Sequence, residues 1–101
     1  MTGLVERTKF PQPINLDAVD RDWADRGYSY HRFEDPAGQV WRDFVHMTNE
    51  VVTVAEGQLK VTIEGEAFVA DVGAEVFIPR GATHSVANTA AGKTVWLFGY
   101  D

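Results

Sequence analysis

The sequence contains no cysteine among its 101 residues. It therefore has no disulfide framework, no thiol nucleophile and no cysteine ligand for a metal ion. Basic residues are also few, with 9 Lys and Arg against 15 Asp and Glu and a net charge of −6. Because binding to nucleic acids and to anionic membranes depends on Lys and Arg, this balance argues against both kinds of partner.

Long hydrophobic runs are missing as well. No segment approaches the roughly 20 apolar residues that cross a bilayer, and the first stretch, "MTGLVERTKFPQP", lacks the apolar region of a signal peptide. Hydrophobic residues make up 45% of the sequence and charged residues 24%, which are the proportions of an ordinary globular domain. We therefore expect a single domain that resides in the cytoplasm.

A short helix is predicted ahead of the main body. Asn15 is a favourable N-cap residue, and Gly27 provides a stop. Three apolar residues between them recur at helical spacing: Leu16, Val19 and Trp23. The pattern predicts a helix over 16–26. Together with the proline-containing arm before it, the helix forms an N-terminal region, 1–27, that packs on the rest of the chain.

Residues 28–101 show the pattern of an all-β domain. Short runs such as "EVVTVAEG" and "QLKVTIEG" are rich in Val, Ile and Thr, and most of them end at glycine. We expect about eight strands in a sandwich or barrel. "EGQ" and "EGE" are typical of tight hairpin turns. Since no segment is long enough for a helical crossover, the sheets should be mostly antiparallel.

His46, Glu50 and His84 are candidate metal ligands. On one straight strand His46 and Glu50 would lie about 13 Å apart, but a bend at "MTN" lets the first end one strand and the second begin the next. His84 follows a tight turn with Pro79 in its second position and Gly81 in its fourth, so it also lies at a strand end. Two imidazoles and a carboxylate suit Fe(II) or Zn. The alternative is three solvated side chains at separate strand ends.

Two segments resemble motifs of a known family. "GAEVFIPRGATHSVAN" (73–88) resembles the second cupin motif, and four positions match the first: Gly38, His46, Glu50 and Gly57. The resemblance implies an all-β fold, a single cupin β-barrel (double-stranded β-helix or jelly roll) with the short N-terminal arm and helix, and it implies a homodimer. It also implies one divalent metal ion (Zn, Fe, Ni or Mn) bound by His46, Glu50 and His84.

Phe44 departs from the first cupin motif, which normally has a histidine at this position. Phenylalanine cannot bind a metal ion. Its ring would make this side of the site apolar and leave a coordination position open to water or to a ligand. His31 either supplies a fourth ligand or faces solvent or an interface.

Strand parity predicts further pocket residues. If His46 points into the barrel, Phe44 and Arg42 share its face, and Val52 shares the face of Glu50. An inward Arg42 would bind a substrate carboxylate. The alternative is that Arg42 reaches solvent near the start of its strand.

Aromatic residues on two strands are also relevant to the pocket. Trp41 has the opposite parity to His46, which predicts an outer face or a dimer contact. Trp96, Phe98 and Tyr100 alternate along the last strand, where they line the cavity or cover an interface. We include Phe98 among the expected pocket residues.

The sequence supports more than one function. The first is a metal-dependent enzyme of the isomerase, lyase or dioxygenase class, as the cupin resemblance implies, with Glu50 moving protons. The second is a non-catalytic module that binds a small molecule, a sugar or an organic acid. A third is a barrel that has lost its site and serves as a structural unit. A small polar organic ligand is the expected partner in the first two.

Overall fold

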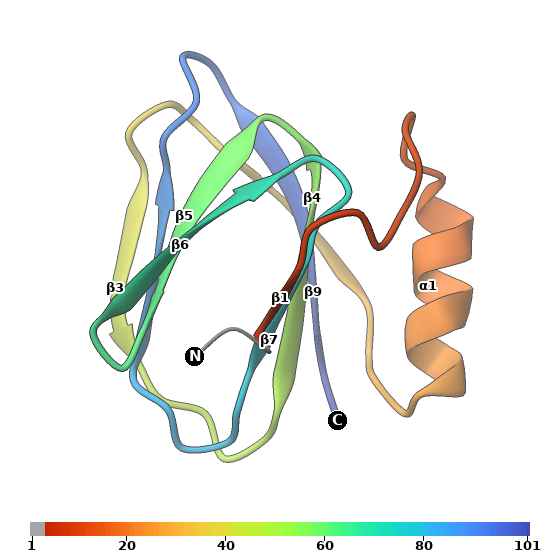
Figure 1. Ribbon diagram of the computed structural model, residues 1–101, viewed down its shortest axis with the longest axis horizontal. Coiled ribbons are helices and arrows are strands. Elements are labelled where there is room, and N and C mark those ends of the chain that lie inside the picture. Colours follow the sequence, from red (N-terminus) through yellow and green to blue (C-terminus); the bar gives the residue numbers. More distant parts are fainter. Residues whose placement is uncertain (1–3) are drawn as a thin grey trace.

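The computed structural model describes residues 4–101 and shows two antiparallel β-sheets that face each other, with a helix beside them (Figure 1). The first sheet has the order β1-β7-β4-β9-β2, with bounds Val5–Glu6, Glu75–Ile78, Glu50–Glu56, Thr94–Tyr100 and His31–Asp35. The second has the order β3-β8-β5-β6, with bounds Val40–Phe44, His84–Asn88, Gln58–Ile63 and Glu66–Asp71. The predicted all-β barrel is confirmed, with antiparallel pairing between its named strands.

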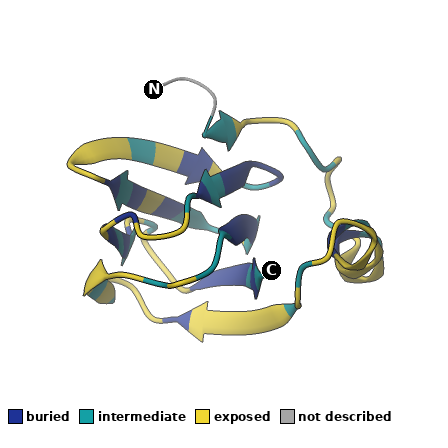
Figure 2. Ribbon diagram, turned by 90° about the horizontal axis from the view of Figure 1, so that it is seen from below, coloured by how far each residue is buried: buried dark blue, intermediate teal, exposed yellow. Residues whose placement is uncertain are grey.

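Helix α1, Leu16–Asp25, confirms the predicted helix and ends one residue earlier than expected. The Asn15 side chain caps it by accepting a hydrogen bond from the Ala18 N–H at 3.1 Å. Two residues of the helix and two of the sheet form a fully buried apolar cluster: Val19, Trp23, Val51 and Leu97. The helix therefore packs on the outer face of β4 and β9, and its other side is exposed (Figure 2).

The N-terminal arm contains a strand that the sequence did not predict. In β1, Val5 pairs with Val76 of β7, so the arm extends the edge of the first sheet. Residues 1–3 of the expected region 1–27 lie outside the described residues. The division into an arm with helix and a barrel over 28–101 stays a prediction.

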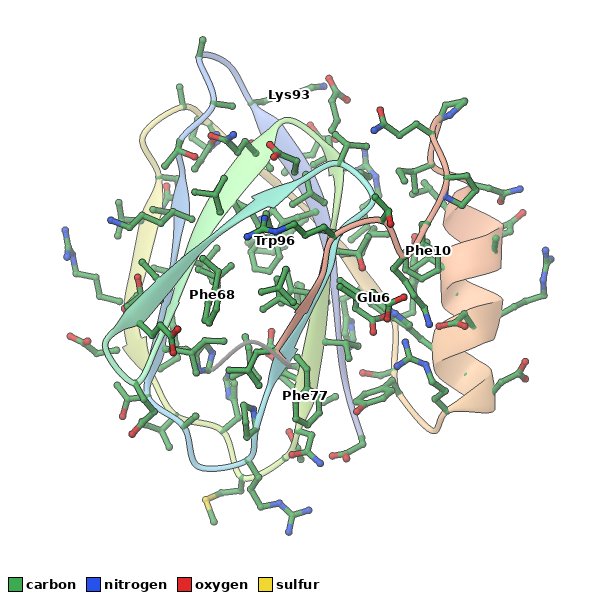
Figure 3. The ribbon with its side chains drawn as sticks, in the orientation of Figure 1. Glu6, Phe10, Phe68, Phe77, Lys93 and Trp96 are labelled. Atoms are coloured by element: carbon green, nitrogen blue, oxygen red, sulfur yellow. The ribbon has the colours of Figure 1, made fainter. Side chains whose placement is uncertain are left out.

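The main core fills the space between the sheets. Its buried side chains come from both inner faces and include Val52, Val54, Leu59, Val61 and Val76. Trp96 also points into this space (Figure 3). Burying each Val or Leu contributes about 1.5–3 kcal/mol. Strand β4 is apolar on both faces because Val51 meets the helix while Val52 meets the core.

The turns explain where strands begin and end. Glu64 and Gly65 have φ angles of 49° and 83°, the backbone of a type I′ hairpin turn, as predicted for "EGE". The hairpin predicted at "EGQ" was wrong, because Gly57 connects β4 of the first sheet to β5 of the second. The turn before β8 lies one residue later than expected. Its hydrogen bond joins the Ala82 N–H to the Pro79 carbonyl at 3.1 Å, which places Gly81, with φ of 79°, in the third position.

Candidate metal centre and adjoining cavity

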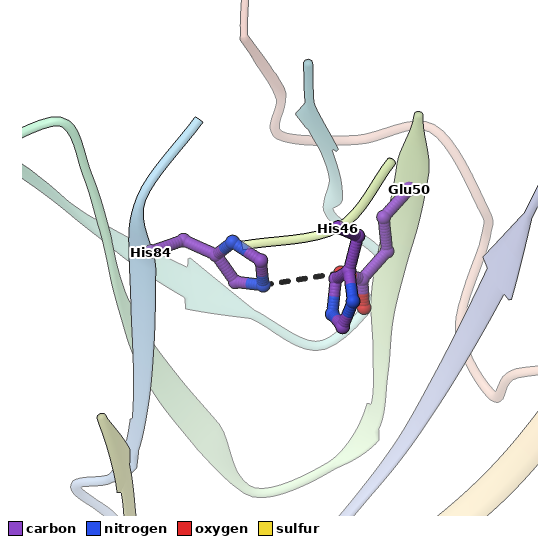
Figure 4. Close-up of side chains that lie close together, drawn as sticks. All are labelled: His46, Glu50 and His84. Carbon is purple, nitrogen blue, oxygen red and sulfur yellow. Dashed lines mark ion pairs between the residues drawn. The ribbon is translucent and has the colours of Figure 1, made fainter. Parts of the chain in front are cut away.

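Three side chains converge at one end of the barrel. His46 lies in the bend between β3 and β4, Glu50 is the first residue of β4, and His84 is the first residue of β8. Their ligand atoms all lie within 4.8 Å of one another. Glu50 Oε1 is 3.3 Å from His84 Nε2 and 3.6 Å from His46 Nε2 (Figure 4). The predicted bend thus brings the three candidate ligands together.

The bend that carries His46 is fixed by neighbouring chain segments. Asn49 donates its backbone and side-chain N–H groups to the Asp101 carboxylate at 2.9 and 2.8 Å. Its side-chain oxygen accepts a hydrogen bond from the Arg80 N–H at 2.8 Å. The Gly81 N–H donates to the carbonyl of His46 itself at 2.9 Å. Because the backbone on both sides is held, the imidazole of His46 is presented toward Glu50.

Glu50 has a buried oxygen that lacks an aligned hydrogen-bond donor. The residue is 4% exposed, and its Oε1 accepts no hydrogen bond from residues 4–101, although two imidazole nitrogens lie close by. These nitrogens approach closely enough for an ion pair but are not aligned as hydrogen-bond donors. A buried carboxylate in this condition is costly. Ligand atoms that share a zinc ion at about 2.1 Å lie up to about 4.2 Å apart, and both Glu50 distances fall within that limit.

The environment of His84 suits a metal ligand. Its Nδ1 lies 3.1 Å from the Ala82 carbonyl, so a neutral ring keeps its proton on Nδ1 and presents the lone pair of Nε2 to Glu50. Burial by itself lowers the pKa of His84, but the Glu50 carboxylate and the Ala82 carbonyl raise it, and the net shift is upward. The site therefore favours a positive charge between the two side chains, supplied either by a proton or by a metal ion.

Phe44 lies beside the three ligands, as its motif position suggested. It pairs in register with His84 across β3 and β8, and its ring centroid is 6.1 Å from that of His84 and 6.1 Å from that of His46. The side chain is 38% exposed. An apolar ring thus occupies the side of the site where a further ligand was expected.

Tyr100, which the sequence indicated only as part of the alternation along the last strand, lies beside the candidate ligands. Its hydroxyl is 3.5 Å from His46 Nε2, and it pairs with Glu50 across β9 and β4. Burial and the negative charge of Glu50 raise its pKa, so the phenol keeps its proton at neutral pH. The alternation of Trp96, Phe98 and Tyr100 indicated a shared face but not which end reaches the metal ligands.

A cavity of about 150 Å³ adjoins the candidate ligands. Besides the three ligands and Val86, six aromatic residues line it: Phe33, Trp41, Phe44, Trp96, Phe98 and Tyr100. Phe44 and Phe98 therefore lie where they were expected. Val52 instead belongs to the apolar core. Arg42 is exposed and does not line the cavity.

The expected outward position of Trp41 was wrong. The pairing of β3 with β8 shifts between Trp41 and Phe44, and Asp43 between them has a φ of 56°. This irregularity breaks the alternation of side chains, so Trp41 and Phe44 line the same cavity while Arg42 points away. His31 is also exposed, and its ring stacks on Phe98 at 5.0 Å instead of joining the ligands.

Comparisons with known proteins agree with this architecture. The model of the cupin domain family matches residues 31–100. A cupin 2 domain-containing protein from Halorhodospira halophila has a similar structure, with a TM-score of 0.68 and 23% identity over 73% of this chain and 52% of that chain. For TT1209 from Thermus thermophilus the TM-score is 0.66 and the identity 25%, over 72% of this chain and 71% of that chain.

A third similar structure is an oxalate oxidase in complex with the substrate analogue glycolate, with a TM-score of 0.67 and 24% identity over 74% of this chain and 42% of that chain. This chain spans about half the length of the Halorhodospira halophila protein that it matches. A comparison with curated proteins found no match. Among the described residues, no helix combines the length and apolar character that a membrane span requires.

Proposed function

The chain belongs to the cupin family, and we propose that it binds one divalent transition-metal ion through His46, Glu50 and His84. We propose further that it acts as a metal-dependent enzyme on a small oxygen-bearing ligand in the adjoining cavity. The oxygen of Glu50 that lacks a hydrogen bond carries this proposal. When both imidazoles are neutral, they and the carboxylate present lone pairs to one another, and a shared cation would turn that repulsion into attraction.

The residues around the ligands have distinct roles in this proposal. A divalent ion bound here would polarise an oxygen of the substrate as a Lewis acid. Glu50 can take up a proton on the carboxylate oxygen that does not bind the ion. Tyr100 retains its proton, because burial raises its pKa, and it can donate a hydrogen bond to a ligand oxygen. Phe44 excludes water on one side and leaves coordination positions for the ligand.

Metal analysis of the purified protein tests the metal site. We expect about one equivalent of a divalent transition metal per chain in the wild type, and less than a tenth of that in His84→Ala. His31→Ala is the matched control, because that histidine is exposed and lies outside the cluster, and it should retain the metal. Metal content that is far below one equivalent in the wild type and unchanged in His84→Ala would overturn the proposal.

Turnover assays test the enzymatic part. We expect metal-dependent product formation with a compound from among small keto acids, sugars and phenols. Ligand-dependent thermal stabilisation without product would indicate instead a non-catalytic binding module. The expected homodimer stays a prediction, and light scattering tests it by looking for twice the monomer mass of 11.2 kDa.

A further inference from the structure

We propose that the cavity selects a ligand whose body is a single ring without a negative charge, with the metal-binding oxygens at one edge of that ring. The inference rests on the proposed metal site and adds the substrate class. It arises from four aromatic side chains on the cavity wall beyond the metal ligands, here called the aromatic sleeve: Phe33, Trp41, Trp96 and Phe98.

Asp35 fixes the two tryptophans of the sleeve. This carboxylate is 2% exposed at the end of β2, and its Oδ2 accepts hydrogen bonds from Trp41 Nε1 at 3.0 Å and from Trp96 Nε1 at 2.9 Å. Trp41 belongs to the second sheet and Trp96 to the first. One carboxylate oxygen therefore orients two indole rings from opposite walls, and the rings are in place before a ligand arrives.

Phe33 joins the two tryptophans into one wall. Its ring centroid lies 5.9 Å from those of both Trp41 and Trp96, and it meets Trp96 edge-on at 76°. Phe98 meets Phe33 at 80° and 5.8 Å. Edge-to-face packing of this kind leaves ring faces available to a further ring.

The dimensions of the cavity fit one ring. Trp96 and Tyr100 are four residues apart on β9, which corresponds to about 13 Å along the strand. The metal ligands lie at the Tyr100 end of this span, and the indole rings of Trp41 and Trp96 lie at the other end. A volume of about 150 Å³ is the size of an apolar cavity that accommodates benzene. A single-ring ligand can thus reach the metal ion with its oxygens while its body contacts the sleeve.

The charges of the cavity disfavour an anionic body. No Lys or Arg is among the described residues that line it, so a carboxylate at the sleeve would find no ion-pair partner on the cavity wall. Asp35 lies behind the indoles, and its Oδ2 accepts their N–H groups, so its carboxylate adds a negative charge near this wall. The ligand that fits best therefore carries no negative charge at this end.

Indole N–H resonances of the zinc-loaded protein provide the test, because the chain has three tryptophans. Trp23 binds Glu75 outside the cavity and serves as the internal reference. We expect 4-methylcatechol to shift the resonances of Trp41 and Trp96 and to leave that of Trp23 unchanged. 3,4-Dihydroxybenzoate has the same pair of chelating hydroxyls and a carboxylate in place of the methyl group. Its affinity should be lower by a factor of about ten or more. Equal affinity for the two probes would overturn the proposal.

Asp35→Asn tests the positioning role of Asp35. Glu75→Gln is the matched control, because Glu75 accepts the hydrogen bond of Trp23, which lies outside the cavity. We expect Asp35→Asn to weaken 4-methylcatechol binding by about tenfold and to move the Trp41 and Trp96 N–H resonances, with zinc stoichiometry unchanged. Glu75→Gln should alter neither. Unchanged catechol affinity in Asp35→Asn would contradict the role of the carboxylate, and the wild-type probe comparison tests the sleeve even if this variant does not fold.

The two proposals fail in distinguishable ways. If zinc does not bind but phenol still shifts the two cavity indoles, the metal function is wrong and the sleeve stands. If zinc binds stoichiometrically and saturating 4-methylcatechol leaves both cavity indoles unmoved, the sleeve is wrong and the metal site stands.

Discussion

Glu50 and Glu75 are both buried carboxylates on the first sheet, on the paired strands β4 and β7, yet their surroundings differ. Glu75 Oε1 accepts a hydrogen bond from Trp23 Nε1 at 2.9 Å and a second from the Arg26 guanidinium. Glu50 Oε1 accepts none from the described part of the chain and faces two imidazoles. The first carboxylate is satisfied by donors of the same chain, whereas the second has no aligned hydrogen-bond donor there.

Under the proposed function, this contrast separates a carboxylate that holds the fold together from one that would bind the metal ion. The donors of Glu75 come from α1 and the residue after it, so the carboxylate attaches the helix to the sheet. The neighbours of Glu50 can themselves act as acceptors once they are neutral. Burial alone does not distinguish the two roles, but the identity of the neighbouring groups does.

The largest difference between variants of Glu50 and Glu75 should appear in how far zinc raises the melting temperature. Zinc at about 100 times its dissociation constant should stabilise the wild type by about 2.7 kcal/mol, which is a rise in melting temperature of roughly 10–20 °C for a domain of this size. The rise should disappear in Glu50→Ala and persist in Glu75→Ala. Thermal melts with and without zinc measure it, and a rise that survives in Glu50→Ala would contradict the assignment.

In the absence of metal, Glu75→Ala should lower the free energy of unfolding more than Glu50→Ala does. Glu75→Ala leaves the fully buried Trp23 N–H without an acceptor and should lower the free energy of unfolding by about 1–3 kcal/mol. Glu50→Ala removes a carboxylate with an unsatisfied oxygen and should lower it by no more than about 1 kcal/mol. Urea denaturation of the two metal-free variants checks this. Equal losses would remove the distinction between the two sites.

The pH should change metal affinity through His84. Because the pKa of His84 is raised in the metal-free protein, its ring holds a proton to a higher pH than an ordinary histidine, and the proton competes with the ion. Zinc affinity should therefore rise about tenfold per pH unit below that raised pKa and level off above it. Competition titrations with a chelator across this range measure the slope, and a flat profile would count against His84 as a ligand.

The smallest effect should come from the surface side of the Glu75 network. Arg26 also pairs with Asp22 at 2.8 Å, and these two side chains are 35% and 33% exposed. Asp22→Ala should lower the free energy of unfolding by only about 0.3–0.5 kcal/mol. Urea denaturation beside Glu75→Ala shows whether the buried partner outweighs the exposed one. A loss as large as that of Glu75→Ala would show that the pairing of Arg26, and not the hydrogen bond from Trp23 to Glu75, anchors the helix.

The motif residues were predictable because their spacing encodes strand ends. The bend after His46 and the turn before His84 follow from residues with strong local preferences, such as Pro79 and Gly81. The helix was predictable from Asn15 and its periodic apolar residues for the same reason. These features depend on local sequence: the structure confirms the bend and the helix and places the turn before His84 one residue later than predicted.

Other features depend on pairing between distant segments. Trp41 was misplaced because the irregularity at Asp43 is a property of the pairing of β3 with β8, which alternation alone does not reveal. Tyr100 approaches His46 only because β9 pairs with β4. Asp35 gave no signal in the sequence, since its two indole partners are brought to it from separate strands. Such contacts follow from tertiary register, not from local pattern.

Phe44 has a consequence for how the protein would acquire its metal. With an aromatic ring instead of another ligand beside the cluster, the chain would contribute three donors to the proposed ion, and solvent or substrate would complete its coordination shell. Two imidazoles and a carboxylate impose little preference among first-row ions beyond their general order of affinity. The identity of the ion would then depend on which metals the surroundings supply, and the same polypeptide would carry different ions under different growth conditions.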